Sequence, residues 1–128
     1  MLQRQGTMVL KAQNKVEGFE TVEVPLKDIH ILVDPNSPHH GVKYKACAES
    51  LEKGMRWPII LSTYETYWKK EKLWPKHTKE GYGVTNGNKR VLWAIDNDYK
   101  MIDSIIVKSK QERDKVNKST YIFFKEYP

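Results

Sequence analysis

The sequence has a single cysteine and no long apolar run, and each scarcity narrows the range of possible proteins. The one cysteine, Cys47, excludes an internal disulfide and is typical of a protein in a reducing compartment. No apolar stretch approaches the roughly 18 residues of a transmembrane helix, so no membrane partner is expected. The apolar patch at residues 8–10 is too short for the hydrophobic part of a signal peptide. We therefore expect a cytoplasmic protein.

Motifs for metal binding and for nucleophilic catalysis are also missing. Two of the four histidines are adjacent, His39 and His40, but no cysteine pair accompanies them, so a structural zinc site is not expected. The acidic residues form no recognisable cluster for two-metal phosphoryl chemistry, which needs convergent carboxylates. No Walker A spacing and no Ser-His-Asp arrangement is present. His39 and His40 remain as the candidate general bases.

What the sequence does contain is enough chain for one domain, together with an excess of positive charge. Its 128 residues are enough to bury a hydrophobic core without help from disulfides or a structural metal. A composition of 39% apolar and 30% charged residues is typical of a soluble globular chain. The formal net charge of +6 favours a polyanionic partner such as nucleic acid or a nucleotide. Basic proteins also exist that bind neither, so charge alone does not decide the function.

The segment 83–95 carries the most informative pattern, because it predicts a strand, a turn and a helix in succession. Val84 lies in a short β-compatible run, and Asn86-Gly87 ends that run with residues that tolerate positive φ. Apolar residues then recur at i, i+3 and i+4, as on one face of an amphipathic helix. These residues are Val91, Ala94 and Ile95.

A helix that begins at Asn88 would present unpaired backbone N–H groups and the positive end of its dipole. Lys89 and Arg90 add two cations at the same place, which predicts an anion site with phosphate as the expected anion. Two alternatives stay open. Asn-Gly is also a hairpin signal, and a Lys-Arg pair is often only solvated.

The rest of the chain alternates strands and helices, which predicts an α+β fold with a small mixed sheet and helices packed on it. We expect residues 1–19 to be a flexible or peripheral lead and residues 20–128 to form a single domain. The expected strands cover 20–25, 57–61, 101–107 and 120–124, and residues 31–33 are expected to form a short strand or an extended piece. A turn is expected at 26–29, a loop at 34–41, and helices at 42–54 and 109–117, the last with a capping box. Cys47 falls on the apolar face of the first of these helices, as a core residue would.

Residues 63–80 form an insertion in which aromatic residues alternate with lysines. Aromatic rings can stack on unpaired bases while lysines contact phosphates, so the insertion is a candidate for nucleic-acid binding. The alternative is a hairpin or loop whose tryptophans pack on the core and whose lysines are solvated. The residues proposed to bind nucleic acid are Tyr67, Trp68, Lys69, Lys70, Lys72, Trp74 and Lys76.

Four segments together resemble the ParB/sulfiredoxin-like superfamily, across roughly residues 21–108. Residues 24–29 (Val-Pro-Leu-Lys-Asp-Ile) look like the opening strand of the family, and residues 48–54 like the end of its first helix. Residues 57–60 (Trp-Pro-Ile-Ile) resemble its next strand. Gly87-Asn88-Lys89-Arg90 is similar to its Gly-x-x-Arg phosphate motif.

The resemblance implies a ParB/sulfiredoxin-like fold in which Gly87, Asn88, Lys89 and Arg90 hold phosphate and Ser50 adds a hydroxyl. The loop with His39 and His40 lies where ParB proteins carry a basic residue near the nucleotide. Sulfiredoxins have a catalytic cysteine at the position of Asn88, so sulfiredoxin chemistry is not expected here. No helix-turn-helix or dimerisation domain follows, which favours a free-standing domain of the kind found in phage and plasmid genomes.

Three functions are consistent with these patterns. The first is a nucleic-acid-binding protein or DNA nuclease, in which His39 or His40 activates water. The second is an NTP-binding enzyme or switch. The third is a non-catalytic phage protein that binds a host protein through its aromatic insertion, in the host cytoplasm. Mg²⁺ and a nucleotide are the candidate cofactors, no metal ligand is assigned, and catalysis itself stays an open question.

Overall fold

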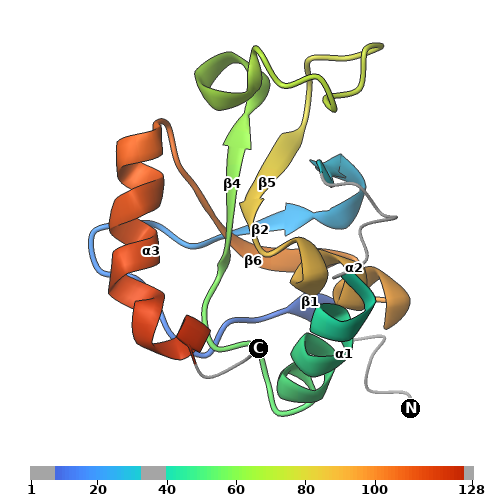
Figure 1. The fold of residues 1–128 in the computed structure, drawn as a ribbon, viewed down its shortest axis with the longest axis vertical. Coiled ribbons are helices and arrows are strands. Elements are labelled where there is room, and N and C mark those ends of the chain that lie inside the picture. The colour runs from blue at the N-terminus through green and yellow to red at the C-terminus, as the bar shows by residue number, and fades with distance from the viewer. Residues whose placement is uncertain (1–7, 33–39, 126–128) are drawn as a thin grey trace.

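A computed structural model describes residues 8–32 and 40–125, with only the backbone described for residues 40–44 and 121–125. Within these residues, six strands form one mixed sheet and three α-helices pack on it (Figure 1). The strands are β1 (Val9–Leu10), β2 (Val22–Pro25), β3 (Ile29–His30), β4 (Ile59–Thr63), β5 (Tyr82–Asn86) and β6 (Met101–Ile106). The helices are α1 (His40–Leu51), α2 (Asn88–Asp96) and α3 (Lys110–Lys125), with a 3₁₀ turn η2 (Leu26–Asp28) and a π-helical segment η3 (Tyr64–Trp68). The expected α+β class with a mixed sheet is confirmed.

Strand β6 lies inside the sheet, with a paired neighbour along each of its edges. Ile102 pairs with Leu10 of β1 and with Val24 of β2, so β1 and β2 lie on opposite edges of β6. Farther along β6, parallel β4 takes over the edge that β1 occupies. Antiparallel β5 follows β4, and parallel β3 follows β5. The turn after β5 therefore lies beside the start of β4.

The alternation of side chains along the strands builds one core on each face of the sheet. Ile59 and Leu61 point into a core that contains residues of α1 and α2, whereas Ile60 points into a second core that contains Val116 of α3. This is the period-two pattern of a strand buried on both faces. As a result, α1 and α2 lie together on one side of the sheet and α3 lies on the other (Figure 1).

The expected boundary between an N-terminal lead and the domain at residue 20 needs correction. Residues 1–7 lie outside the described part of the chain, but β1 already belongs to the sheet. Leu10 and Val16 are buried in the two cores, and the backbone N–H of Ala12 donates to the Asp103 carboxylate at 2.8 Å. Burial of these apolar side chains ties residues 8–19 to the domain, although β1 itself lies at the edge of the sheet.

The strand expected at 120–124 is wrong, because α3 continues through it to Lys125. One half of the expected capping box is confirmed, because the N–H of Glu112 donates to Ser109 Oγ at 3.1 Å. The Glu112 carboxylate accepts instead from the N–H of Lys108, the residue before the N-cap, at 2.8 Å. No glycine or proline follows before Lys125 to end the helix. Val116 and Thr120 lie one turn apart and are both buried, so packing overrides the β-propensity of the aromatic residues beyond them.

Other expected elements are displaced by a few residues. The turn at 26–29 is confirmed as η2, but the next strand is Ile29–His30 rather than 31–33. Residue 33 and the first six residues of the expected loop at 34–41 lie outside the described residues. The helix expected at 42–54 is α1, which ends at Leu51, and Gly54 follows with a positive φ of 114°. These shifts leave the predicted order of elements unchanged.

Candidate functional site

The turn between β5 and α2 has the geometry that the sequence predicts. Gly87 adopts a left-handed conformation, with φ at 117°, and α2 begins at the next residue. A Cβ atom at Gly87 would lie 2.6 Å from the Ile59 Cγ2 atom, so the site has no room for a side chain. Both the conformation and the close approach of β4 therefore require glycine here. The strand–turn–helix prediction is confirmed, and the hairpin alternative is wrong.

The first turn of α2 directs backbone donors out of the helix. The first intrahelical bond runs from the N–H of Val91 to the carbonyl of Gly87, at 3.0 Å. The N–H groups of residues 88–90 precede that bond, and Gly87 has no side chain with which to cap them. Together with the dipole of α2, these groups favour an anion at this end of the helix.

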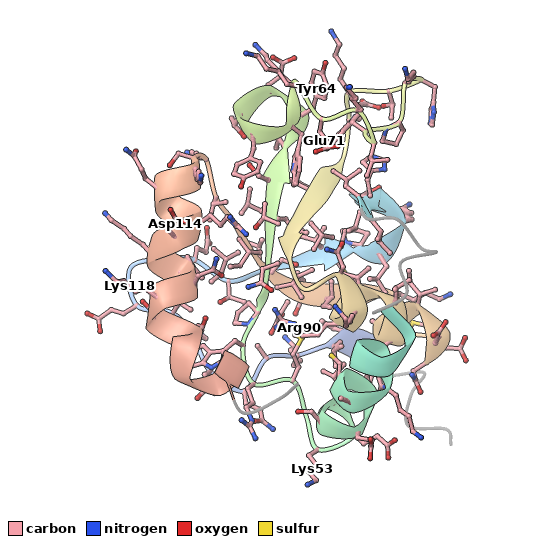
Figure 2. The ribbon with its side chains drawn as sticks, viewed as in Figure 1. Lys53, Tyr64, Glu71, Arg90, Asp114 and Lys118 are labelled. Carbon is pink, nitrogen blue, oxygen red and sulfur yellow. The ribbon has the colours of Figure 1, made fainter. Side chains whose placement is uncertain are left out.

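The two cations of this turn lie in different environments. Lys89 is half-buried, whereas Arg90 is only 3% exposed and donates from Nη1 to the backbone carbonyl of Trp57 (Figure 2). The guanidinium thus ties α2 to the segment that leads into β4. A buried guanidinium needs hydrogen-bond acceptors, and the chain supplies one here. The phosphate-binding role expected of Arg90 stays a prediction.

The Asn88 side chain has an unsatisfied polar atom. Its Oδ1 atom is buried and accepts no hydrogen bond from the described part of the chain. A buried acceptor without a donor destabilises the folded state by about 1–3 kcal/mol. Residues that lower stability in this way are often retained for function. Asn88 therefore stays a candidate ligand-binding residue.

Helix α1 brings Cys47 toward the same turn. Burial raises the pKa of the Cys47 thiol, and the nearby positive charges of Arg90 and Lys89 act in the opposite direction. Cys47 is buried in the core, as predicted. Ser50 is half-buried and lies three residues further along α1, so the two side chains are neighbours on the helix surface. The phosphate-binding role of Ser50 stays a prediction.

Neither of the two histidine candidates has a side chain in the described part of the structure. His39 lies outside the described residues, and His40 is the first residue of α1 but its side chain lies outside the description. Among the residues that the structure describes, no three histidine, cysteine or acidic side chains come together as a metal site would require. The role of His39 and His40 as general bases stays a prediction.

Trp74 of the insertion packs inward, which corrects its predicted role in base stacking. The indole is only 4% exposed, and its Nε1 donates to the Thr78 carbonyl at 2.9 Å. Its ring lies edge-on to His30, with 4.8 Å between centroids, and 5.4 Å from the ring of Tyr64. An indole in this position has no free face to offer a base.

Tyr67 and Trp68 are half-buried and lie against each other, with 4.8 Å between their ring centroids. Trp68 also covers the backbone of Gly83, where an added Cβ would lie 2.5 Å from Nε1. The lysines assigned to nucleic-acid binding are all exposed: Lys69, Lys70, Lys72 and Lys76. The insertion thus follows the alternative interpretation for its tryptophans and keeps its lysines at the surface.

The insertion and the Gly87 turn lie at opposite ends of β5. That strand has five residues, and a rise of about 3.3 Å per residue separates its ends by roughly 17 Å. Figure 2 labels Tyr64 and Glu71 at one end of the molecule and Arg90 well away from them. The two basic regions are therefore separate sites.

A cavity of about 630 Å³, which the sequence does not predict, lies between β1 and the C-terminal ends of α1 and α2. Its walls come from three distant parts of the sequence, so no local pattern announces it. The polar and aromatic residues that line it are Lys11, Gln13, Glu52, Trp93, Asn97 and Tyr99. Trp93 and Tyr99 form one wall, with 5.9 Å between their ring centroids.

No protein-family model matches the chain, and no curated protein matches it either. Its class therefore rests on the structure: an α+β domain with a mixed sheet, a glycine turn that opens a helix, and a separate basic insertion. None of the helices in the described ranges is long and apolar enough to cross a membrane.

Proposed function

We propose that this protein binds a phosphate-bearing ligand at the N-terminus of α2, and that the ligand is nucleic acid. One observation carries the proposal: left-handed Gly87 begins a helix whose first N–H groups have no side-chain cap and stand beside Lys89. Backbone donors, a helix dipole and a neighbouring ammonium are the elements of a phosphate site. The net charge of +6 adds a long-range attraction for a polyanion.

A ParB/sulfiredoxin-like fold is part of the same proposal. It is supported by the order in which the four family-like segments fall on β2, α1, β4 and the β5–α2 turn. One departure bears on the mechanism. The residue at the arginine position of the Gly-x-x-Arg motif, Arg90, is buried and bonded to the Trp57 carbonyl, so we assign it to positioning the turn.

The residues then divide into three roles. Backbone N–H groups of Asn88 and Lys89 donate to phosphate oxygens, and the Lys89 ammonium adds a charge-assisted contact. Arg90 holds the turn in place through its hydrogen bond to the Trp57 carbonyl, just before β4. If the protein also cleaves its ligand, a general base such as His39 or His40 is needed to activate water, with Mg²⁺ as the candidate cofactor.

The test measures binding of fluorescently labelled single- and double-stranded DNA by anisotropy over a range of salt concentrations. We expect affinity to fall with salt, and Lys89→Ala to reduce the slope of log K against log salt by about 0.9, because one phosphate is no longer neutralised. Lys27→Ala is the matched control, because Lys27 is an exposed lysine on η2. Incubation of the same DNA with and without Mg²⁺ reports cleavage. Binding that is absent, or that is insensitive to salt, contradicts the proposal.

A free nucleoside triphosphate is the second candidate, favoured by two features of the helix pair. Ser50 of α1 would supply a hydroxyl, as the family resemblance implies, and the unsatisfied Oδ1 of Asn88 suits a ligand that carries hydroxyl or N–H donors. A compact ligand between α1 and α2 would use both. Calorimetric titration with ATP, CTP and GTP separates the candidates, because a protein that binds only DNA has no saturable site for any of them.

A further inference from the structure

The insertion (residues 63–80) is a folded platform rather than a loose loop. Thr63 caps η3 by accepting a hydrogen bond from the N–H of Thr66, at 3.3 Å. Trp74 holds the C-terminal half of the insertion in place, because its ring is buried against His30 and Tyr64 and its Nε1 donates to the Thr78 carbonyl. Inward-facing rings of this kind fix the outward-facing residues in place.

Two carboxylates at the outer part of this platform interact with other groups of the same platform. Glu65 pairs with Lys69 at 3.2 Å, and the Oε1 atom of Glu71 accepts a hydrogen bond from the N–H of Leu73 at 3.1 Å. The neighbouring lysines have no ion pair within the described part of the chain. They are Lys70, Lys72 and Lys76, and all three are exposed. The glutamates offset only part of the positive charge, because residues 63–80 contain five lysines and three glutamates.

Leu73 lies within this group of lysines and is 55% exposed. Its exposure exceeds that of Met8 and Ile95, the other large apolar residues that stand out from the described surface. A single exposed leucine is ordinary by itself. Its position among unpaired lysines on a fixed platform is the informative feature, because an apolar anchor with a charged rim is the usual plan of a protein interface.

We propose that the insertion is a docking surface for an acidic segment of a partner protein, with Leu73 as the apolar anchor. Lys70, Lys72 and Lys76 supply the charge complementarity around it. Nucleic acid is the less suitable partner. Trp74 is buried and cannot stack on bases, Trp68 is half-buried against Gly83, and a phosphate backbone offers no apolar surface for Leu73 to contact. This surface lies at the other end of β5 from Gly87, so it does not rest on the function proposed above.

The test uses three fluorescently labelled probes: a peptide that mixes glutamate with leucine, the same peptide with serine for leucine, and oligothymidylate. We expect the wild-type protein to bind the leucine peptide about tenfold more tightly than the serine peptide. Leu73→Ser should remove that preference. Lys70→Ala with Lys72→Ala and Lys76→Ala should weaken both peptides, while the matched triple variant Lys15→Ala, Lys27→Ala and Lys108→Ala should bind as the wild type does.

Circular dichroism and thermal unfolding verify that each variant is folded. The proposal is overturned if Leu73→Ser binds the leucine peptide as tightly as the wild type. It is also overturned if oligothymidylate is the only probe that the insertion lysines affect, since the partner would then be nucleic acid. Lys89→Ala separates the two sites: peptide binding that survives this change shows that the insertion acts independently of the α2 turn.

Discussion

The two basic regions of this protein differ in what determines their structure. At the β5–α2 turn, a left-handed glycine and the start of a helix set the direction of the backbone donors, and these features depend on a few adjacent residues. In the insertion, the direction of each aromatic ring depends on distant partners such as His30 and Gly83. Local chemistry therefore predicts the first region well and tertiary packing decides the second. Substitutions in each region test this difference, and the largest effect is expected at Arg90.

Arg90→Ala should lower the free energy of unfolding by about 3 kcal/mol. The change removes a buried charged donor from the Trp57 carbonyl and leaves a void between α2 and β4. Lys89→Ala, one residue away and half-buried, should change stability by no more than about 0.5 kcal/mol while lowering DNA affinity. Urea unfolding of both variants measures the difference. Equal stability losses in the two variants would mean that the hydrogen bond from Arg90 to the Trp57 carbonyl does not stabilise the fold.

Gly87→Ala should lower stability by about 2 kcal/mol, because the new methyl group meets Ile59 and the left-handed backbone disfavours a side chain. Gly18→Ala provides a matched control. Gly18 also has a positive φ, of 87°, but a Cβ atom there would have nothing within 4 Å. The control should therefore lose only the smaller conformational part, about 1 kcal/mol. Thermal unfolding of the pair checks this, and similar losses at both positions would rule out the contact with β4 as the cause.

Trp74→Phe should cost about 1 kcal/mol, since it removes the hydrogen bond to the Thr78 carbonyl and leaves an aromatic ring in place. Affinity for single-stranded DNA should stay at the wild-type value, because the ring is buried. Chemical denaturation and anisotropy measure the two quantities. A loss of DNA affinity without a loss of stability would restore the stacking role that the burial of Trp74 argues against.

Asn88→Ala should have the smallest effect on stability, with no loss or a slight gain. The change removes a buried oxygen that accepts no hydrogen bond from any described residue. Affinity for the phosphate ligand should nevertheless fall, which is the signature of a residue kept for binding. A clear loss of stability would instead show that the Asn88 side chain has a structural role.

The sequence predicts the elements whose signals are local. Two segments show this, because the residues that give the signal also form the structure. They are Gly87 with the helical period after it, and Ser109 with Glu112 at the start of α3. The α+β class follows from the alternation of such elements. The ParB/sulfiredoxin-like fold rests on resemblance and stays a proposal.

The missed features are those that residues far apart in the chain decide. Phe123 and Phe124 favour a strand by propensity, but the buried face of α3 at Val116 and Thr120 keeps the helix intact. Arg90 resembles a surface cation beside Lys89 until the Trp57 carbonyl, more than thirty positions earlier, is placed against it. Nothing within the local pattern of either segment contains that information.

The most direct test of the phosphate site is a titration of the isotopically labelled protein with tripolyphosphate, followed through its backbone amide resonances. We expect saturable shifts at the amides of Asn88, Lys89 and Arg90, weakened by Lys89→Ala and unchanged by Leu73→Ser. Shifts confined to the insertion lysines, or none at the start of α2, would contradict a phosphate site at this turn.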